Sequence, residues 1–212
     1  MAKSKFKNAI GWLHLWIGFI TGIVVFIVAI TGCIYTFDEE IFDCVHEDLV
    51  YVRAEGQLLP LSELLQKAQQ HLGSEKVIEA VTIKSANHAY IFSASKINDA
   101  NKINLSAFSQ FAYQDDLYIN PYSGEVLGVM DMRYEFFNVV ELLHRQLLFV
   151  KQIGGVVVGS FNFLFLVAVL KGLILWIPKN FKQLKRALTI KYKATWKRVH
   201  YDLHNSIGFY TI

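Results

Sequence analysis

Two long apolar runs dominate the hydropathy pattern of the chain. The segment 9–37 carries no charged side chain, and a second run at 153–178 is interrupted by a single charge, Lys171. Because about 20 helical residues cross the roughly 30 Å hydrocarbon core of a bilayer, each run is long enough to form a transmembrane helix. Lys171 lies close enough to the end of the second run for its ammonium group to reach the headgroup region.

The segment between these runs, 38–130, has the shorter periodicities of a small α+β domain. At 60–73 apolar residues recur on one helical stripe between Pro60 and Gly73, which predicts an amphipathic helix. We expect this helix to pack on one face of an antiparallel sheet. Three strand-like runs follow it, at 77–84, 88–95 and 111–120, and a turn at 120–124 leads into 125–131.

Charge is strongly segregated along the chain. The composition is 53% hydrophobic with a net charge of only +3, yet residues 38–146 hold 17 acidic and 8 basic side chains. The rest of the chain holds 13 basic side chains, mainly in the tail 1–8 and the loop 179–198, and one acid, Asp202. Since Lys and Arg favour the cytoplasmic side of membrane proteins, we predict a multi-pass protein of the bacterial inner membrane with a cytoplasmic N-terminus. Residues 38–150 then lie on the periplasmic side. The basic loop contacts anionic lipid and no nucleic acid.

Two further segments complete the predicted fold. An apolar stripe within 131–150 predicts an amphipathic helix at the outer membrane interface, before a turn at Gly154–Gly155 into the second span. At 199–212 an apolar pattern begins, which we interpret as the start of a third transmembrane helix, truncated here. The fold class expected is therefore an α-helical transmembrane bundle, with two complete spans and a truncated third, carrying an inserted extracytoplasmic α+β domain.

Cys33 and the three histidines of the segment 38–130 are not expected to take part in the chemistry. The sequence ITGC at 30–33 resembles a lipoprotein cleavage site, but the apolar run around it is far longer than the 7–15 residues of a signal-peptide core. We therefore interpret Cys33 as a small buried residue. His46, His71 and His88 lack the spacing of metal ligands, and we expect all three to be solvated.

The unit LHxxIGF occurs twice, around His14 and around His204. Each copy follows a basic stretch and places Gly18 or Gly208 one helical turn after its histidine, on the same face. The repeat predicts pseudo-symmetric halves with both histidines at the same depth on the cytoplasmic side. A histidine with a glycine one turn deeper leaves room for the flat macrocycle of haem b, held by two imidazoles. The alternative is that these histidines lie at the interface and that the glycines mark helix contacts.

The chain also resembles a known family. The segment YINPYSGEVLG at 118–128 resembles the hairpin of PepSY domains. Its position after a transmembrane helix with LHLWIGF at 13–19 resembles the PepSY-associated transmembrane family, over nearly all of the chain. The resemblance implies an iron-regulated inner-membrane protein with at least four spans. Some members are haem-containing ferric-siderophore reductases.

The resemblance extends to individual histidines. Family members keep an HxxxH pair, which corresponds to His200 and His204. These two lie about 6 Å apart along one helix face. Only one of them can pair with His14 on a single haem. Three roles therefore stay open for His200: haem ligand, propionate partner or interfacial residue. The family's LHRxL element matches the sequence around His144 and implies a second haem near the outer face, with Arg145 pairing a propionate. The alternative for His144 is an interfacial residue at headgroup level.

Haem near each face would let electrons cross the membrane from a cytoplasmic or quinol donor, not yet identified, to a ferric siderophore or another iron chelate. Hard oxygen ligands hold Fe(II) more weakly than Fe(III), so one-electron reduction releases the metal. The sequence has no Rossmann fingerprint, P-loop, nucleophile elbow or zinc signature, which argues against direct use of NAD(P)H or flavin by this chain.

The alternative function is non-enzymatic: a membrane-anchored PepSY module that binds or regulates an envelope peptidase or another protein by strand addition. A third is a subunit that anchors a partner in the membrane.

Overall fold

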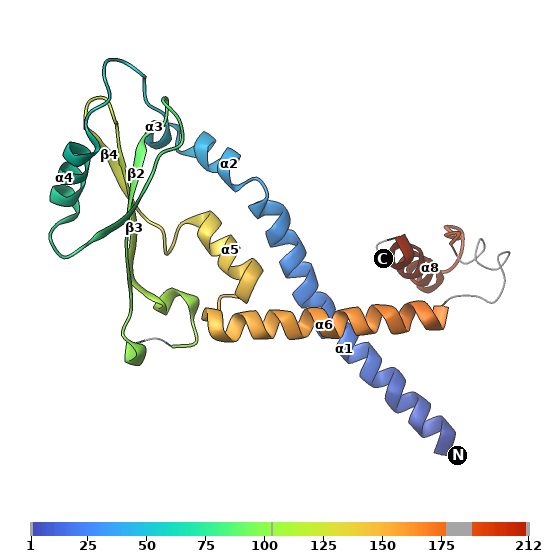
Figure 1. The fold of residues 1–212 in the computed structure, drawn as a ribbon. Coiled ribbons are helices and arrows are strands. Elements are labelled where there is room, and N and C mark those ends of the chain that lie inside the picture. The colour runs from blue at the N-terminus through green and yellow to red at the C-terminus, as the bar shows by residue number, and fades with distance from the viewer. Residues whose placement is uncertain (1, 103, 177–187, 211–212) are drawn as a thin grey trace. The chain divides into compact units, whose positions relative to one another are not determined.

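The computed structural model describes residues 2–102, 104–176 and 188–210. The chain divides into two compact units, one formed by Phe26–Val158 and the other by Met1–Val25 together with Gly159–Ile212 (Figure 1). The division falls within the two longest helices, α1 (Ala2–Tyr35) and α6 (Lys151–Trp176), so each unit contains a part of both.

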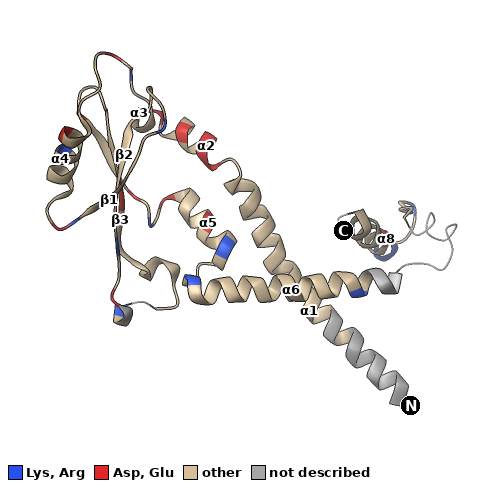
Figure 2. Cartoon of the chain, viewed as in Figure 1, with Lys and Arg blue, Asp and Glu red and all other residues tan. Residues whose placement is uncertain are grey.

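Helices α1 and α6 contain the two apolar runs. Within them Leu15–Tyr35 and Lys151–Gly172 are long and apolar enough to cross a membrane, with mean hydropathies of 2.6 and 2.3. Both spans lack acidic and basic side chains over most of their length (Figure 2). Helix α1 ends two residues before the predicted end of its run, and α6 begins two residues before the predicted start. The predicted end of the second run, 177–178, lies outside the described residues.

The α+β domain contains one antiparallel sheet with the strand order β1-β2-β3-β4. All four predicted strands and the predicted amphipathic helix, α4 (Leu61–Leu72), are confirmed. The strands are β1 (Ile78–Thr82), β2 (Tyr90–Ile97), β3 (Phe111–Ile119) and β4 (Val126–Asp131), and two 3-10 turns, η1 (Ala100–Lys102) and η2 (Ala107–Ser109), lie between β2 and β3.

Alternation along β3 creates the main core of this domain. Successive side chains of a strand point to opposite faces of the sheet. Leu117 and Ile119 therefore share one face, where they are fully buried together with Phe92 of β2. Leu64 and Ala68 of α4, one helical turn apart, cover this face and are also fully buried.

The opposite face of the sheet is covered as well, which the sequence did not predict. Two short helices, α2 (Asp38–Val45) and α3 (Glu47–Val50), follow α1 and lie on the side of the sheet away from α4 (Figure 1). Val50 of α3 is buried in one cluster with Ala89 and Tyr118, and Phe42 of α2 packs against it. The expected helix on one face is therefore confirmed in α4, and the segment after α1 adds a cover on the second face that was not predicted.

An arginine joins the two ends of the β3–β4 hairpin. Nε and Nη2 of Arg133 donate to the carboxylate of Asp131 at 2.9 and 2.7 Å, and Nη1 donates to the carbonyl of Ala112 at 2.7 Å. These bonds favour the charged carboxylate and lower the pKa of Asp131.

Helix α5 (Phe136–Gln146) is shorter than the predicted segment 131–150 and ends in an unusual turn. Leu147 and Leu148 both have positive φ, 51° and 62°. Residues with a Cβ rarely adopt this region, and such strain persists only where the surroundings enforce it. Here the loop before β3 enforces it, because the backbone N–H of Ala107 donates to the carbonyl of Leu148 at 2.8 Å.

The predicted turn at Gly154–Gly155 is wrong. The turn lies at Leu147–Leu148, and Gly154 is inside α6. A Cβ at Gly154 would lie 2.3 Å from Cβ of Gln146, so only glycine lets the start of α6 approach the end of α5 so closely.

The helix α8 (Trp196–Tyr210) contains most of the segment predicted to begin a third span, and residues 211–212 lie outside the described part of the chain. Its buried polar residues, Asp202 and Ser206, are one turn apart on the same face. Asp202 pairs with Nε of Arg198 at 3.0 Å, and the Ser206 hydroxyl donates to the carbonyl of Leu188 at 3.3 Å.

We predict that Leu117→Ala destabilises the sheet by about 2–5 kcal/mol, because it leaves a cavity under α4. Val129→Ala is the matched control, since Val129 is the register partner of Leu117 on β4 but is 42% exposed. It should cost about 0.5 kcal/mol or less. Amide hydrogen exchange of β3 in the detergent-purified chain measures both changes, and equal losses of protection would contradict this assignment of the core.

Candidate functional site

The imidazole of His144 lies against helix α1. Nδ1 is 2.8 Å from the carbonyl oxygen of Val28 and 3.4 Å from Oγ1 of Thr31. Because a carbonyl oxygen can only accept a hydrogen bond, Nδ1 must carry the proton in this contact. In the neutral ring, Nε2 then keeps its lone pair and is the nitrogen able to bind a metal.

Three residues of α1 shape the surface on which this ring rests. Val28, Thr31 and Gly32 are spaced i, i+3 and i+4 and therefore share one face. The buried Thr31 hydroxyl donates within its own helix, to the carbonyl of Ile27 at 2.7 Å, so its proton is already engaged. A Cβ at Gly32 would lie 2.8 Å from Cε1 of His144, too close for any carbon contact. The missing side chain of Gly32 thus makes room for the imidazole.

The sequence interpretation missed this role of α1. Thr31 and Gly32 belong to the ITGC segment, whose sequence resembles a lipoprotein cleavage site and does not indicate a helix contact. Cys33, expected to be buried, is exposed, because the face of α1 that meets α5 is the one bearing Thr31 and Gly32. The available signal was the i, i+3, i+4 spacing of small residues, although it does not identify the partner.

Arg145, predicted to pair with a haem propionate, points to a neighbour on its own helix. Its Nη1 lies 2.7 Å from Oε1 of Glu141, one turn earlier on α5, and its side chain is 65% exposed. This pair raises the pKa of Arg145. The pair uses one of the two terminal nitrogens, so the predicted propionate role stays a prediction.

Helix α8 presents His200 and His204 on one exposed face. The two are one turn apart, and the buried residues Asp202 and Ser206 lie two positions from them, about 200° around the helix. The ring of His200 also contacts the edge of the Trp196 ring, with 4.2 Å between centroids. The structure therefore supports the predicted shared face, and both imidazoles are accessible within the described chain.

His14 lies on α1, but its side chain is outside the described part of the structure, so its pairing with His200 or His204 stays a prediction. Gly18 and Gly208 can be placed: a Cβ at either position would meet no described atom within 4 Å. Close packing among the described residues therefore gives no reason for glycine at these two positions.

The three histidines of the outside domain differ from the expectation that all are solvated. His71 on α4 is exposed, as expected, whereas His46 is half-buried against the ring of Phe42. The His88 side chain is only 15% exposed, with Nδ1 2.6 Å from the Ser85 hydroxyl and Nε2 3.9 Å from a carboxylate oxygen of Asp43. The expectation was wrong for His88 because α2, which sequence reasoning missed, covers it.

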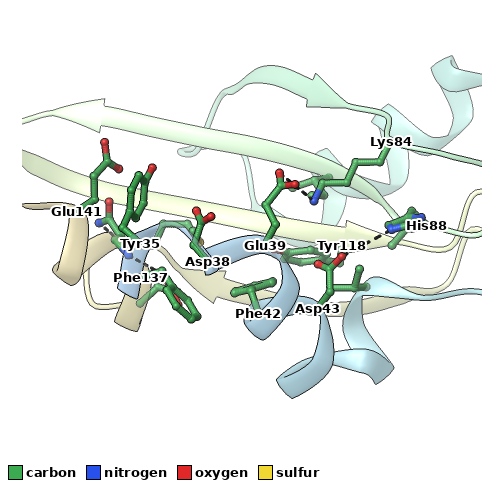
Figure 3. Close-up of a pocket in the computed structure, with 16 residues that line it drawn as sticks. Tyr35, Asp38, Glu39, Phe42, Asp43, Lys84, His88, Tyr118, Phe137 and Glu141 are labelled. Carbon is green, nitrogen blue, oxygen red and sulfur yellow. Dashed lines mark hydrogen bonds and ion pairs between the residues drawn. The ribbon is translucent and has the colours of Figure 1, made fainter. Parts of the chain in front are cut away.

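A cavity of ≈ 260 Å³ lies within the unit Phe26–Val158, where the end of α1, α2, the sheet and α5 meet (Figure 3). Burial and nearby carboxylates raise the pKa of the Tyr118 hydroxyl, which lines this cavity and stays protonated. Within the described residues, no group of three or more His, Cys, Asp or Glu side chains is arranged to hold a metal ion. The charged or titratable residues that line the cavity are Asp38, Glu39, Asp43, Lys84, His88, Glu135 and Glu141.

Comparison with known protein families gives one match, to the family described as the PepSY-associated TM region, over residues 11–212. Comparison with curated proteins gives no match. The matched region includes both candidate spans, the sheet and all of the histidines discussed above.

We predict that Gly32→Ala destabilises the chain, because the added methyl group displaces the His144 ring and breaks its bond to Val28. Overpacking of this kind costs about 1–3 kcal/mol. Gly22→Ala is the matched control on the same helix, since a Cβ there meets no described atom within 4 Å. Melting temperatures in detergent measure both changes.

A double-mutant cycle isolates the contact. In a His144→Ala background the cost of Gly32→Ala should largely disappear, whereas the effect of Gly22→Ala should not change. If Gly32→Ala costs the same with and without the imidazole, the proposed contact is wrong.

Proposed function

Because the chain belongs to the PepSY-associated TM family, we propose that it is a multi-pass inner-membrane protein that binds haem b and passes electrons to a ferric siderophore. Membership of this family and the two apolar helices support a membrane location. The acidic outside domain and the basic segments support the proposed orientation, in which residues 38–150 lie in the periplasm and the N-terminus in the cytoplasm.

The observation that carries the proposal is the hydrogen bond between His144 and Val28. A histidine that ligates a metal through Nε2 usually donates its Nδ1–H to a carbonyl or carboxylate, which fixes the tautomer and the ring orientation. His144 has this arrangement, with Nδ1 2.8 Å from the Val28 carbonyl. His144 would thus be able to hold a haem near the outer face through Nε2, and Arg145 would be able to pair with a propionate.

The second proposed site uses the histidines near the basic segments. His14 would ligate haem from α1, and either His200 or His204 from the exposed face of α8. Gly18, one turn from His14, would leave room beside the histidine for a flat ligand, and Gly208 has the equivalent position after His204. Up to two haems per chain follow from this assignment.

When bound, haem supplies reversible one-electron chemistry. The residues of this chain have a different task. His144, bonded to Val28 and in contact with Thr31, would present Nε2 in one orientation, and the apolar α1 and α6 would anchor the chain in the bilayer. The proposed substrate is a periplasmic ferric chelate, which releases its iron on reduction because hard oxygen ligands hold Fe(II) weakly. The electron donor is a separate molecule.

A second candidate function has an observation of its own. Strand β1 pairs only with β2, so one edge of the sheet is open among the described residues, with exposed Val77 and Ile83 at its ends. An extended segment of an envelope protein could add a strand there. This non-enzymatic function does not require haem.

Absorption spectra test the proposal. The chain, expressed with ample haem and purified in detergent, should show a Soret band that shifts on reduction with dithionite. His144→Ala should lower the haem-to-protein ratio by about half, because it removes an axial ligand of one of two haems. His71→Ala, an exposed histidine of α4, is the control and should leave the ratio unchanged. A colourless protein, or equal ratios in both variants, would contradict the proposal and leave the non-enzymatic function as the better account.

A further inference from the structure

The cavity between α2, the sheet and α5 is lined by both apolar and charged side chains. Aromatic and aliphatic side chains from all three elements line it (Figure 3). Its volume of ≈ 260 Å³ is close to the lower end of small-molecule sites, which are clefts of about 300–1,000 Å³. The apolar lining residues are Phe42, Val50, Ala89, Ile91, Met132 and Phe137.

The charge around this cavity is not balanced. Five carboxylates line it, and two of them have cationic partners: Glu39 with Lys84 at 3.6 Å and Glu141 with Arg145 at 2.7 Å. Asp43 lies 3.9 Å from Nε2 of His88, which is cationic only when protonated. The carboxylate of Glu135 accepts the backbone N–H of Asn138 at 2.7 Å and caps α5, and this bond leaves its negative charge uncompensated. Asp38, which is half-buried, has no cationic partner among the described residues. The negative charges of Asp38 and Glu135 therefore lack a basic partner among the described residues.

An independent observation comes from Tyr118. This tyrosine is 3% exposed, and it lines the cavity from β3. None of the hydrogen bonds among the described residues involves its hydroxyl group. Among the described residues no fully buried side-chain oxygen or nitrogen lacks a hydrogen-bond partner, so this unpaired oxygen is accessible from the cavity and can bond a ligand there. The carboxylates of Asp43 and Glu135 lie close enough to act on this hydroxyl electrostatically.

The chemistry of the lining decides the class of ligand. A metal ion would need three or more ligating side chains around one point, and the described residues contain no such group. Separated carboxylates above aromatic walls instead suit an ammonium group on an apolar stem, which gains ion pairs at one end and cation–π and apolar contacts along the other. We propose that this cavity binds the alkylammonium group of a small molecule or lipid headgroup, with Asp38 and Glu135 as its charge partners and the Tyr118 hydroxyl as a hydrogen-bond acceptor.

Titration of the detergent-purified chain with n-butylammonium tests the proposal directly. The readout is the NMR signal of the Met132 methyl group, which lines the cavity and is assigned with Met132→Leu. The signal should shift with saturation for n-butylammonium, and much less for n-butanol, which has the same stem without the charge. Asp38→Asn should weaken binding about tenfold, because a charge-assisted hydrogen bond is lost. Tyr118→Phe should weaken it about threefold, because a neutral hydrogen bond is lost.

Asp48→Asn is the matched control, because it removes the same charge from the first turn of a neighbouring helix, outside the cavity. It should change the affinity less than about twofold, as expected for a screened surface charge. Equal affinity for n-butanol, equal effects of Asp38→Asn and Asp48→Asn, or displacement of the amine by stoichiometric Mg²⁺ would overturn the proposal. Repeating the titration in nanodiscs distinguishes a lipid headgroup from a soluble amine as the natural ligand. If the ligand is the phosphatidylethanolamine headgroup, it competes with n-butylammonium, and the apparent affinity for n-butylammonium is lower in phosphatidylethanolamine discs than in phosphatidylglycerol discs. If the ligand is a soluble amine, the two affinities are equal.

Discussion

The contact between His144 and helix α1 determines how the outside domain meets the membrane-spanning part of its unit. The Nδ1–H of His144 reaches the Val28 carbonyl at 2.8 Å only because Gly32 has no side chain. The same contact brings α5 to the end of α1, where the two helices border the cavity with α2 and the sheet. On the other side, the strained turn at Leu147–Leu148 and the close approach of Gly154 fix α5 against the start of α6. The half-buried imidazole thus links the orientation of α5 and α1 with the proposed chemistry.

Much of the outside domain could be predicted from local patterns. The apolar residues Leu117 and Ile119 at alternate positions of β3, and the helical stripe of Leu64 and Ala68, identify the core between β3 and α4 because each pattern repeats with the period of its element. Helices α2 and α3 were missed because they are short and their first turns are acidic, so few apolar positions mark a period. Their burial depends on contacts such as that of Val50 with Tyr118, which are distant in sequence.

The candidate site was predicted in part for the same reason. The apolar stripe of α5 and its LHRxL element identify His144, but its partner Val28 is 116 residues away, and a backbone carbonyl leaves no signal in the sequence. Thr31 and Gly32 are visible only as small residues in an apolar run. Similarly, the sequence alone predicts that an acidic residue such as Asp38 is solvated. Its place in the cavity depends on the folding of α2 onto the sheet. The repeat around His14 and His204 shows an equivalence between two segments, whereas the pairing of their imidazoles depends on how the helices come together.

The tautomer of His144 is the most direct test of this account. In the chain labelled with ¹⁵N at histidine and reconstituted without haem, the two ring nitrogens of His144 are distinguished by their chemical shifts, and His144→Gln assigns the signals. At a pH where the ring is neutral, we expect a protonated Nδ1 and an unprotonated Nε2, because the Val28 carbonyl accepts only from Nδ1–H. A ring protonated at Nε2, or one that exchanges freely between both tautomers as in solution, would contradict the contact with α1 and with it the proposed orientation of the iron ligand.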